Sequence, residues 1–290
     1  MKIPGERMKI LIAYDGSACS DAALDDLRNA GLPSVADTLI AAVIGDVDVL
    51  AADGAEVDLS EAAIIENSLA RASARLAAQF PEWRLEEREL AGMPGEQILA
   101  LAREWSPDLI LVGSHGRNWL QRMVLGSVSL RVLREARCTV RVGRRRPVPK
   151  NGGLRIMIAV DGSRHSEAAV QEAISRHWPA GTKARLITIH QPVAGIYGVG
   201  TATREELERA HANHERLLPV LRNAGLEASS IIDEDNVASR IVYESEQWSA
   251  NCIFIGARGL GPMASLFLGS VSSAVAERAH CSVEIVHLRD

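Results

Sequence analysis

The chain has 290 residues, of which 47% are hydrophobic, and it carries a formal net charge of −5. This length allows one large domain or two ordinary ones, and the acidic balance disfavours nucleic acid and anionic membranes as partners because both attract basic surfaces. With no apolar run near the roughly 18 residues of a membrane span and no signal-peptide pattern at the start, we expect a soluble cytoplasmic protein.

Short apolar runs alternate with segments of helical periodicity along the whole chain. In the first half we predict strands at 10–14, 38–44, 84–90, 109–113 and 139–142, with helices at 20–30, 59–79, 96–105 and 127–136. In the second half we predict strands at 156–160, 184–190, 229–233, 252–256 and 282–286, with helices at 167–177, 204–224, 237–248 and 270–279. Near-continuous Val, Ile and Leu strands joined by helices indicate parallel strands buried on both faces. The fold class is therefore α/β, with two tandem five-stranded parallel-sheet sandwiches.

Two motifs occur in both halves and show that the chain is a duplication. The stretch YDGSACSDAA matches VDGSRHSEAA, which places Asp15 and Asp161 at equivalent positions 146 residues apart. The pattern G-x-x-G-x(9)-G-S also occurs twice, with a constant offset of 143 residues. We place the domains at 1–143 and 154–290, joined by a linker at 144–153 that is rich in Pro, Gly and basic residues. The basic residues of this linker are either an anion-binding patch or solvated chain.

The glycine pattern predicts an anion-binding crevice at the carboxyl ends of strands one and four. In open α/β sheets ligands bind there, at the topological switch point. Glycines after strand four let main-chain N–H groups approach an anion, and the start of the next helix supplies further N–H groups and a serine hydroxyl. The alternative is that the glycines are only turn residues, that Ser127 and Ser270 are helix N-caps, and that the two aspartates cap turns.

The aspartate that closes strand one, together with G-x-x-G-x(9)-G-S, resembles the universal stress protein family. The tandem layout is similar to the two-domain members, whose fold is Rossmann-like and related to the adenine-nucleotide α-hydrolases. The resemblance covers about residues 8 to 143 and 154 to 290, and it includes ARCTV and AHCSV before the last strands. Thr139 and Ser282 depart from the proline that family members often carry there.

The resemblance implies that ATP or a related adenine nucleotide binds in each domain, with or without Mg²⁺. The adenosine would lie against the first aspartate and the main chain of strand two, and the phosphates would lie among the glycines and the serine. The implied residues are Asp15, Val43, Gly113, Gly116, Gly126 and Ser127 in the first domain, and Asp161, Ile189, Gly256, Gly259, Gly269 and Ser270 in the second.

The resemblance further implies a regulatory role in a stress response, through nucleotide occupancy and regulatory protein partners that the sequence does not identify. The two domains would form an internal pseudo-dimer through their last strands, and whole chains would form a homodimer. Two other interpretations stay open: a slow ATP hydrolase of the same fold, and an interaction module that holds no nucleotide.

Sequence evidence for catalysis is weak. The chain lacks the P-loop pattern G-x-x-x-x-G-K-[ST], so no lysine of that kind reaches the phosphates. His115 in GSHG is either a phosphate donor or a bystander, and Trp119 either covers a ligand or joins a subunit contact. His211 and His214 either bind a metal or, as we expect, face solvent. We expect no dedicated metal site, and we expect the four cysteines to be reduced core residues.

Overall fold

Each half of the chain folds around a parallel β-sheet in the computed structural model, which describes residues 7–44, 59–115, 125–146, 153–195, 198–260 and 268–288. Contacts divide the chain into two units, Met1–Arg28 with Pro33–Arg144 and Asn29–Leu32 with Arg145–Asp290. No helix within the described ranges combines the length and the apolar character that a bilayer crossing needs.

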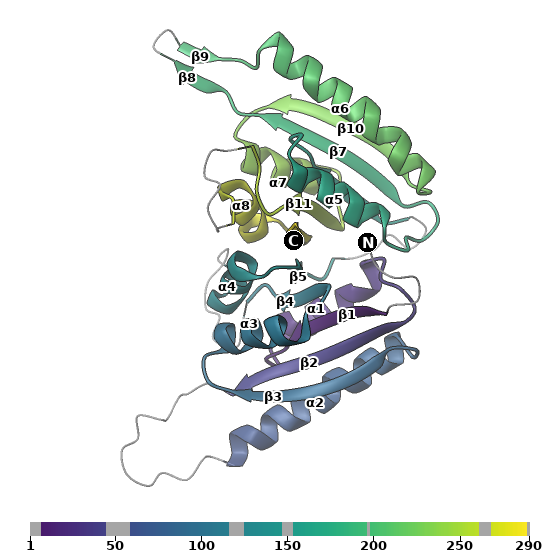
Figure 1. Ribbon diagram of the computed structural model, residues 1–290, viewed down its shortest axis with the longest axis vertical. Helices are drawn as coiled ribbons and strands as arrows, with labels where there is room; N and C mark the ends of the chain where they lie inside the picture. The colour runs from purple at the N-terminus through teal and green to yellow at the C-terminus, as the bar shows by residue number, and fades with distance from the viewer. Residues whose placement is uncertain are drawn as a thin grey trace. The chain divides into compact units, whose positions relative to one another are not determined.

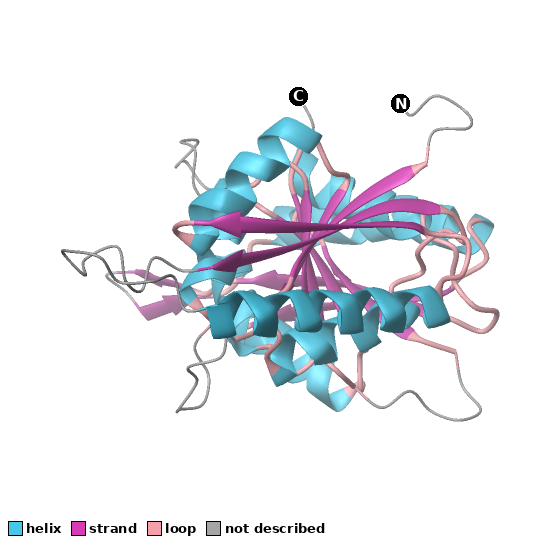
Figure 2. Ribbon diagram, turned by 90° about the horizontal axis from the view of Figure 1, so that it is seen from below, coloured by secondary structure: helices cyan, strands magenta, loops and turns pink. Residues whose placement is uncertain are grey.

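In the first unit the strand order is β3-β2-β1-β4-β5, and neighbouring strands are parallel (Figure 1). The helices α1 and α2 pack together on one face of these strands, and α3 and α4 pack together on the other (Figure 2). The strands are β1 (Met8–Ala13), β2 (Ala36–Ile44), β3 (Arg84–Ala91), β4 (Leu109–Gly113) and β5 (Thr139–Gly143). The helices are α1 (Ala18–Asp26), the 3₁₀ turn η1 (Leu27–Asn29), α2 (Leu59–Gln79), α3 (Pro94–Trp105) and α4 (Ser127–Glu135).

The second unit repeats this order as β10-β7-β6-β11-β12, again with parallel neighbours. Here α5 and α6 cover one face, and α7 and α8 cover the other. The strands are β6 (Arg155–Ala159), β7 (Lys183–His190), β10 (Glu227–Glu234), β11 (Cys252–Gly256) and β12 (Ser282–Val286). The helices are α5 (Arg164–Ile174), α6 (Arg204–Asn223), α7 (Val237–Gln247) and α8 (Ser270–Arg278). The sequence did not predict the antiparallel hairpin of β8 (Val193–Gly195) and β9 (Gly198–Gly200).

The central strand of each sheet is buried on both faces, as the apolar runs predicted. Consecutive side chains of a strand point to opposite faces, and Ile10, Leu11 and Ile12 of β1 are all at most 1% exposed. In β6, Ile156 and Ile158 belong to the core beneath α5 and α6. A sheet whose strands bury both faces needs helices on each side, which is why the α/β prediction is confirmed.

Each unit also buries one ion pair beside its last strand. Arg141 of β5 has a fully buried side chain whose Nη2 lies 2.6 Å from Oδ2 of Asp26 in α1. In the second unit Glu284 of β12 takes the equivalent position, and its Oε2 lies 2.7 Å from Nη2 of Arg176, which follows α5. A buried charge requires a partner of opposite sign. In each unit the last strand is therefore joined by charge, as well as by apolar packing, to the first helix or to the residues just after it.

Candidate functional site

The first and fourth strands of each unit are neighbours, as the predicted crevice requires. β1 pairs with β4, and β6 pairs with β11. Since the chain leaves β1 toward β2 on one side and enters β4 on the other, the switch point lies between these strands. Asp15 follows β1 by two residues, and Asp161 follows β6 by two residues. The sheet thus brings each aspartate to the same edge as the glycine that ends the fourth strand.

The Asp-Gly-Ser stretches are tight turns that start the first helix of each unit. Gly16 and Gly162 have φ angles of 73° and 83°, in the left-handed region that favours glycine. Asp15 Oδ1 accepts a hydrogen bond from the Ser17 N–H at 3.0 Å, and Asp161 Oδ1 accepts one from the Ser163 N–H at 2.9 Å. The turn-capping interpretation of both aspartates is confirmed. In the second unit, the other carboxylate oxygen of Asp161 makes a further contact.

That second oxygen ties Asp161 to the loop after β11. Asp161 Oδ2 accepts a hydrogen bond from the Leu260 N–H at 3.2 Å. A Cβ added at Gly259 would stand 2.5 Å from the same oxygen, so a side chain at this position would displace the carboxylate. The second glycine of the motif is therefore needed for the close approach between Asp161 and the loop. Its counterpart Gly116 lies outside the described residues, as do Trp119 and the stretch 261–267.

The first glycine of the motif has a packing role that sequence reasoning missed. A Cβ at Gly256 would stand 2.7 Å from the carbonyl carbon and from Cβ of His165 in α5. At Gly113 it would stand 3.1 Å from the main-chain nitrogen of Ser20 in α1. In both units the glycine lets the end of the fourth strand approach the start of the first helix. We had explained it by the approach of an anion, and the structure adds a reason that needs no ligand.

The Gly-Ser pair begins the fourth helix of each unit, but the serine is not the cap. The N-caps of α4 and α8 are Gly126 and Gly269, and neither helix has a side-chain capping hydrogen bond. The alternative in which Ser127 and Ser270 are N-caps is therefore wrong, since each serine is the first helical residue. Glycine as N-cap leaves the N–H groups of the first turn without an acceptor side chain, which makes the helix start a suitable place for an anion.

Main-chain and serine hydrogen bonds hold this helix start against the end of the fourth strand. Gly269 N–H donates to the Ala257 carbonyl at 2.8 Å, and the Ser272 hydroxyl donates to the same carbonyl at 2.9 Å. In the first unit the Gly126 N–H donates to the Ser114 carbonyl at 3.0 Å. The Ser129 hydroxyl donates to the Gly113 carbonyl at 2.7 Å. The second serine of G-S-x-S thus fixes the helix start to the strand.

These features line one cavity of about 530 Å³ in the second unit. One part of its wall is apolar, and the other part consists of the aspartate, the loop after β11 and the start of α8. The apolar part includes Ile187, Ile189, Val237, Ile241 and Ile255, and the polar part includes Asp161, Ser166, Arg258, Gly259, Gly269, Ser270 and Ser272. All six residues that the sequence implied for this unit line the cavity, namely Asp161, Ile189, Gly256, Gly259, Gly269 and Ser270.

In the first unit, those implied residues that the structure describes take equivalent places in the fold. Asp15 follows β1, Val43 is half-buried near the end of β2, and Gly113 ends β4. Gly126 and Ser127 begin α4. The Ser17 hydroxyl donates to the His115 carbonyl at 3.5 Å, which links the Asp-Gly-Ser turn to the loop after β4.

Arg258 is a lining residue that sequence reasoning overlooked. It follows β11 by two residues and lies 143 residues after His115, so the second unit has a guanidinium where the first has an imidazole. Burial lowers the pKa of nearby His165 below its usual 6.5, the charge of Arg258 lowers it further, and Asp161 acts in the opposite direction. In the sequence, Arg258 could have been recognised as a charged residue between the first two glycines of the motif.

The histidine pair on α6 differs from its prediction. His214 is only 2% exposed, and its Nε2 lies 2.8 Å from the hydroxyl of Thr188 in β7. Burial lowers the pKa of His214 to about 4, and the charge of His211 adds to this effect. The expectation that both side chains face solvent is wrong for His214, because the polar helix turns this position toward the sheet. No cluster of three or more His, Cys, Asp or Glu that could hold a metal occurs among the described residues.

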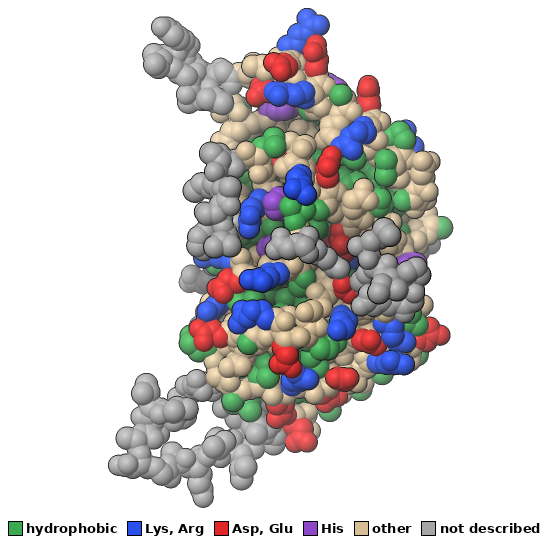
Figure 3. Space-filling model, in the orientation of Figure 1, with side chains coloured by type: hydrophobic (Ala, Val, Ile, Leu, Met, Phe, Trp, Pro, Cys, Tyr) green, Lys and Arg blue, Asp and Glu red, His purple; other side chains and the backbone are tan. Residues whose placement is uncertain are grey.

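Among the four cysteines, Cys138, Cys252 and Cys281 are buried, whereas Cys19 is half-exposed at the start of α1. In the predicted linker, Arg146 is not simply solvated chain, because its Nη1 donates to the Ala250 carbonyl at 3.0 Å. Lys150 lies outside the described residues. On the face shown in Figure 3, Lys and Arg side chains are interspersed with Asp and Glu side chains.

The fold and the site define a class of protein: tandem α/β units, each with a doubly wound parallel sheet and a glycine-lined switch point. The model of the universal stress protein family matches residues 6–144 and again 154–287, so the chain belongs to that family and has two such domains.

Known proteins of this family resemble the chain in sequence and in structure. A universal stress protein of Mycobacterium tuberculosis is 31% identical over 184 residues, which cover 61% of this chain and 60% of that protein. One of Methanocaldococcus jannaschii is 31% identical over 141 residues, covering 46% of this chain and 80% of that protein. The chain thus spans about 60% of the length of the mycobacterial relatives that it matches.

A solved universal stress protein structure from Archaeoglobus fulgidus superimposes with a TM-score of 0.71. The match covers 97% of this chain and 98% of that one, at 20% sequence identity. At this identity the likeness concerns the fold.

Proposed function

We propose that each unit binds an adenine nucleotide, ATP, at its switch point, and that occupancy of these sites is the regulatory signal of the protein in a stress response. The observation that carries the proposal is the start of α8, which lacks a capping side chain and lines the same cavity as an apolar wall. A nucleotide is divided in the same way as the cavity wall, since it has an anionic phosphate chain at one end and a flat, largely apolar base at the other.

The size and the apolar wall of the cavity fit the base and the sugar. Its volume of about 530 Å³ lies within the range of roughly 300–1,000 Å³ that small-molecule and cofactor sites span. Ile187 and Ile189 of β7 form part of the wall from the sheet, and Val237 and Ile241 form part of it from α7. Branched aliphatic side chains on a strand and a facing helix suit the two faces of a planar ring. Burial of that ring is the main apolar contribution to affinity.

The polar part of the wall supplies partners for phosphates. The N-cap of α8, Gly269, has no side chain that accepts from the first-turn N–H groups, the helix dipole favours negative charge there, and Ser270 adds a hydroxyl. Arg258 brings a guanidinium, which binds phosphate oxygens in a bidentate manner. We infer that Arg258, Gly269 and Ser270 would hold the phosphate chain.

Asp161 gives the ligand its direction. A carboxylate repels phosphates, so the anionic chain would lie toward α8, and the hydroxyl or amino donors of the adenosine would lie toward Asp161. The Leu260 N–H now occupies one oxygen of Asp161. Since a carboxylate oxygen has more than one acceptor site, the same aspartate can accept a hydrogen bond from the ligand while it holds the loop. Asp161 would therefore orient the nucleotide rather than react with it.

A test follows from the glycine N-caps. Gly269 has φ −65° and ψ 151°, a backbone conformation that aspartate adopts readily as an N-cap. Gly269→Asp would place a carboxylate beside the first-turn N–H groups, where it would compete with phosphate, although its Cβ would stand 3.2 Å from the Ala257 carbonyl oxygen and from the Ser272 Oγ, so these atoms must shift slightly. Gly126→Asp does the same in the first unit, where φ is −59° and ψ is 147°. Thr203→Asp is the matched control, because it places the same charge at the N-cap of α6, whose residues do not line the cavity.

The assay is chromatography of the adenine nucleotide that denatured, freshly purified protein releases, together with calorimetric titration of stripped protein with ATP. We expect nucleotide in the unsubstituted protein, a loss of one site in each glycine variant, and an unchanged content in Thr203→Asp. If stripped protein binds no ATP and purified protein carries none, the proposal fails and the crevice belongs to an interaction module. ADP accumulating in step with bound ATP would favour the hydrolase instead.

A further inference from the structure

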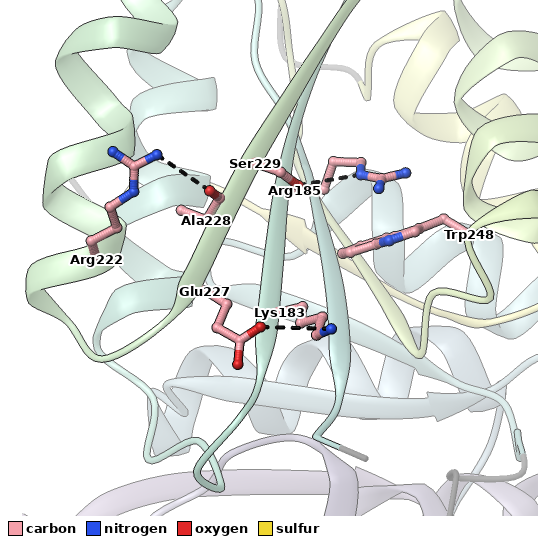
Figure 4. A pocket seen from close by; sticks show the side chains of 7 residues that line it. All are labelled: Lys183, Arg185, Arg222, Glu227, Ala228, Ser229 and Trp248. Atoms are coloured by element: carbon pink, nitrogen blue, oxygen red, sulfur yellow. Dashed lines mark hydrogen bonds and ion pairs between the residues drawn. The ribbon is translucent and has the colours of Figure 1, made fainter.

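A second cavity of about 540 Å³ lies at the other end of the sheet in the second unit (Figure 4). Lys183 and Glu227 are the first residues of β7 and β10, so this cavity is at the amino ends of parallel strands. The switch-point cavity is at their carboxyl ends, and the two cavities have no lining residue in common. The other charged or aromatic side chains that line this cavity are those of Arg185, Arg222 and Trp248.

The lining is cationic in a chain whose overall charge is negative. Lys183, Arg185 and Arg222 are positive and Glu227 is negative, which gives a net charge of +2 for the lining residues. The charges next to Arg185 do not alter this balance, because Arg155 and Glu244 are of opposite sign. The chain as a whole carries −5. The cavity therefore concentrates positive charge on an otherwise acidic protein, which favours an anion.

Arg185 and Trp248 form a fixed pair on one side of the cavity. The guanidinium carbon of Arg185 lies 4.2 Å from the centre of the Trp248 ring, within cation–π range. Trp248 is the C-cap of α7, and Nη1 of Arg155 donates to its carbonyl at 2.8 Å. Burial lowers the pKa of Arg185 from its ordinary value. A partly desolvated guanidinium that is already held against an aromatic ring can bind an anion with little further loss of conformational freedom.

The present hydrogen bonds of these cations are long, so their donors are available to a ligand. Arg185 Nε lies 3.4 Å from the Ser229 hydroxyl, and Arg222 Nη2 lies 3.5 Å from the Ala228 carbonyl. Lys183 Nζ lies 3.6 Å from Glu227 Oε2 (Figure 4). Charge-assisted bonds of full strength are about 2.7–2.9 Å long. Each guanidinium also has five N–H donors, of which these contacts engage one.

We propose that this cavity is a second binding site, for a small organic phosphate monoester. The phosphoryl group would lie between Lys183 and Arg185, with Arg222 adding positive charge at the rim, and the organic part would lie against the Trp248 ring. A phosphate monoester carries a charge of about −1.5 to −2 at neutral pH, which matches the +2 of the lining. The volume suits a small molecule. The proposal is independent of the nucleotide at the switch point.

The test follows the indole N–H signal of Trp248 by NMR on the full chain, assigned by its loss in Trp248→Phe. Phenyl phosphate is the probe, and separate titrations with inorganic phosphate, phenol and an oligoglutamate peptide distinguish the sources of binding. Arg185→Gln and Lys183→Gln each remove one cation while keeping an amide donor. Arg204→Gln on α6 is the matched control, since that side chain is 92% exposed and does not line the cavity.

We expect the Trp248 signal to shift on titration with phenyl phosphate, more weakly with inorganic phosphate, and not with phenol. Removal of one charged donor should weaken binding about ten- to a hundredfold, whereas Arg204→Gln should change it less than about twofold. Added salt should weaken binding in the unsubstituted protein. A signal that does not move with phenyl phosphate, or an affinity that neither Arg185→Gln nor Lys183→Gln reduces, would overturn the proposal. So would preferential binding of the oligoglutamate peptide.

Discussion

Adding one methyl group at Gly256 should destabilise the second unit more than the equivalent change at Gly113 destabilises the first. The new Cβ of Gly256→Ala would stand 2.7 Å from two atoms of His165 and 2.8 Å from its carbonyl oxygen, so the start of α5 must move. Overpacking of this kind costs up to about 3 kcal/mol, and the lower entropy of the unfolded alanine chain offsets about 0.5–1 kcal/mol. The expected net loss is about 2 kcal/mol.

At Gly113 the nearest atoms would be 3.1, 3.2 and 3.3 Å away, which a small adjustment of α1 relieves. We expect a net loss below about 1 kcal/mol for Gly113→Ala, since the same entropic term offsets a smaller clash. The two substitutions are chemically identical and occupy equivalent positions. Each is therefore the control for the other.

The assay is amide hydrogen exchange of nucleotide-free protein, followed by mass spectrometry of peptides from β4 and β11. It reports each unit separately, which a single unfolding transition of a two-domain chain does not. A loss of about 2 kcal/mol corresponds to roughly 30-fold faster exchange. Unchanged exchange of β11 in Gly256→Ala, or a larger effect of Gly113→Ala, would refute the packing role of this glycine.

Three further outcomes follow from single side chains. Because burial depresses the pKa of His214 from 6.5 to about 4, the neutral form is favoured in the folded protein, and its contribution is fully present above pH 6.5. As the pH falls from 6.5 toward 4, the free energy of unfolding should fall by up to about 3 kcal/mol. In urea unfolding experiments at several pH values, His214→Gln should lack this pH-dependent loss. Thr203 forms a capping box with Glu206 at the start of α6, so Thr203→Ala should cost about 1 kcal/mol and speed the exchange of amides in the first turn of α6. Arg258→Gln should weaken ATP about tenfold or more but leave adenosine nearly unchanged in calorimetric titrations; equal weakening of both ligands would place Arg258 away from the phosphates.

Local sequence determined much of the scaffold because the interactions that set it are local. The Asp-Gly-Ser turn requires a glycine with positive φ and a serine that caps the next helix, and both can be recognised within a few residues. The apolar runs predicted the parallel strands because a strand buried on both faces needs apolar residues at every position. The repeated glycine spacing predicted a crevice at the carboxyl ends of the strands, and in the second unit a cavity lies there.

Tertiary structure decided which side chains meet, and no local pattern contains that information. Arg185 and Trp248 are far apart in the sequence, and the cavity they share exists only because α7 ends beside β7. His214 belongs to a polar helix, and its burial against Thr188 depends on which side of α6 faces the sheet. Gly256 is required by the close approach of β11 to α5, a distance that its neighbours in sequence do not set. The periodicity of apolar residues thus determined which segments are helices and strands and which of them are buried. The packing of helices against strands determined which side chains line the two cavities.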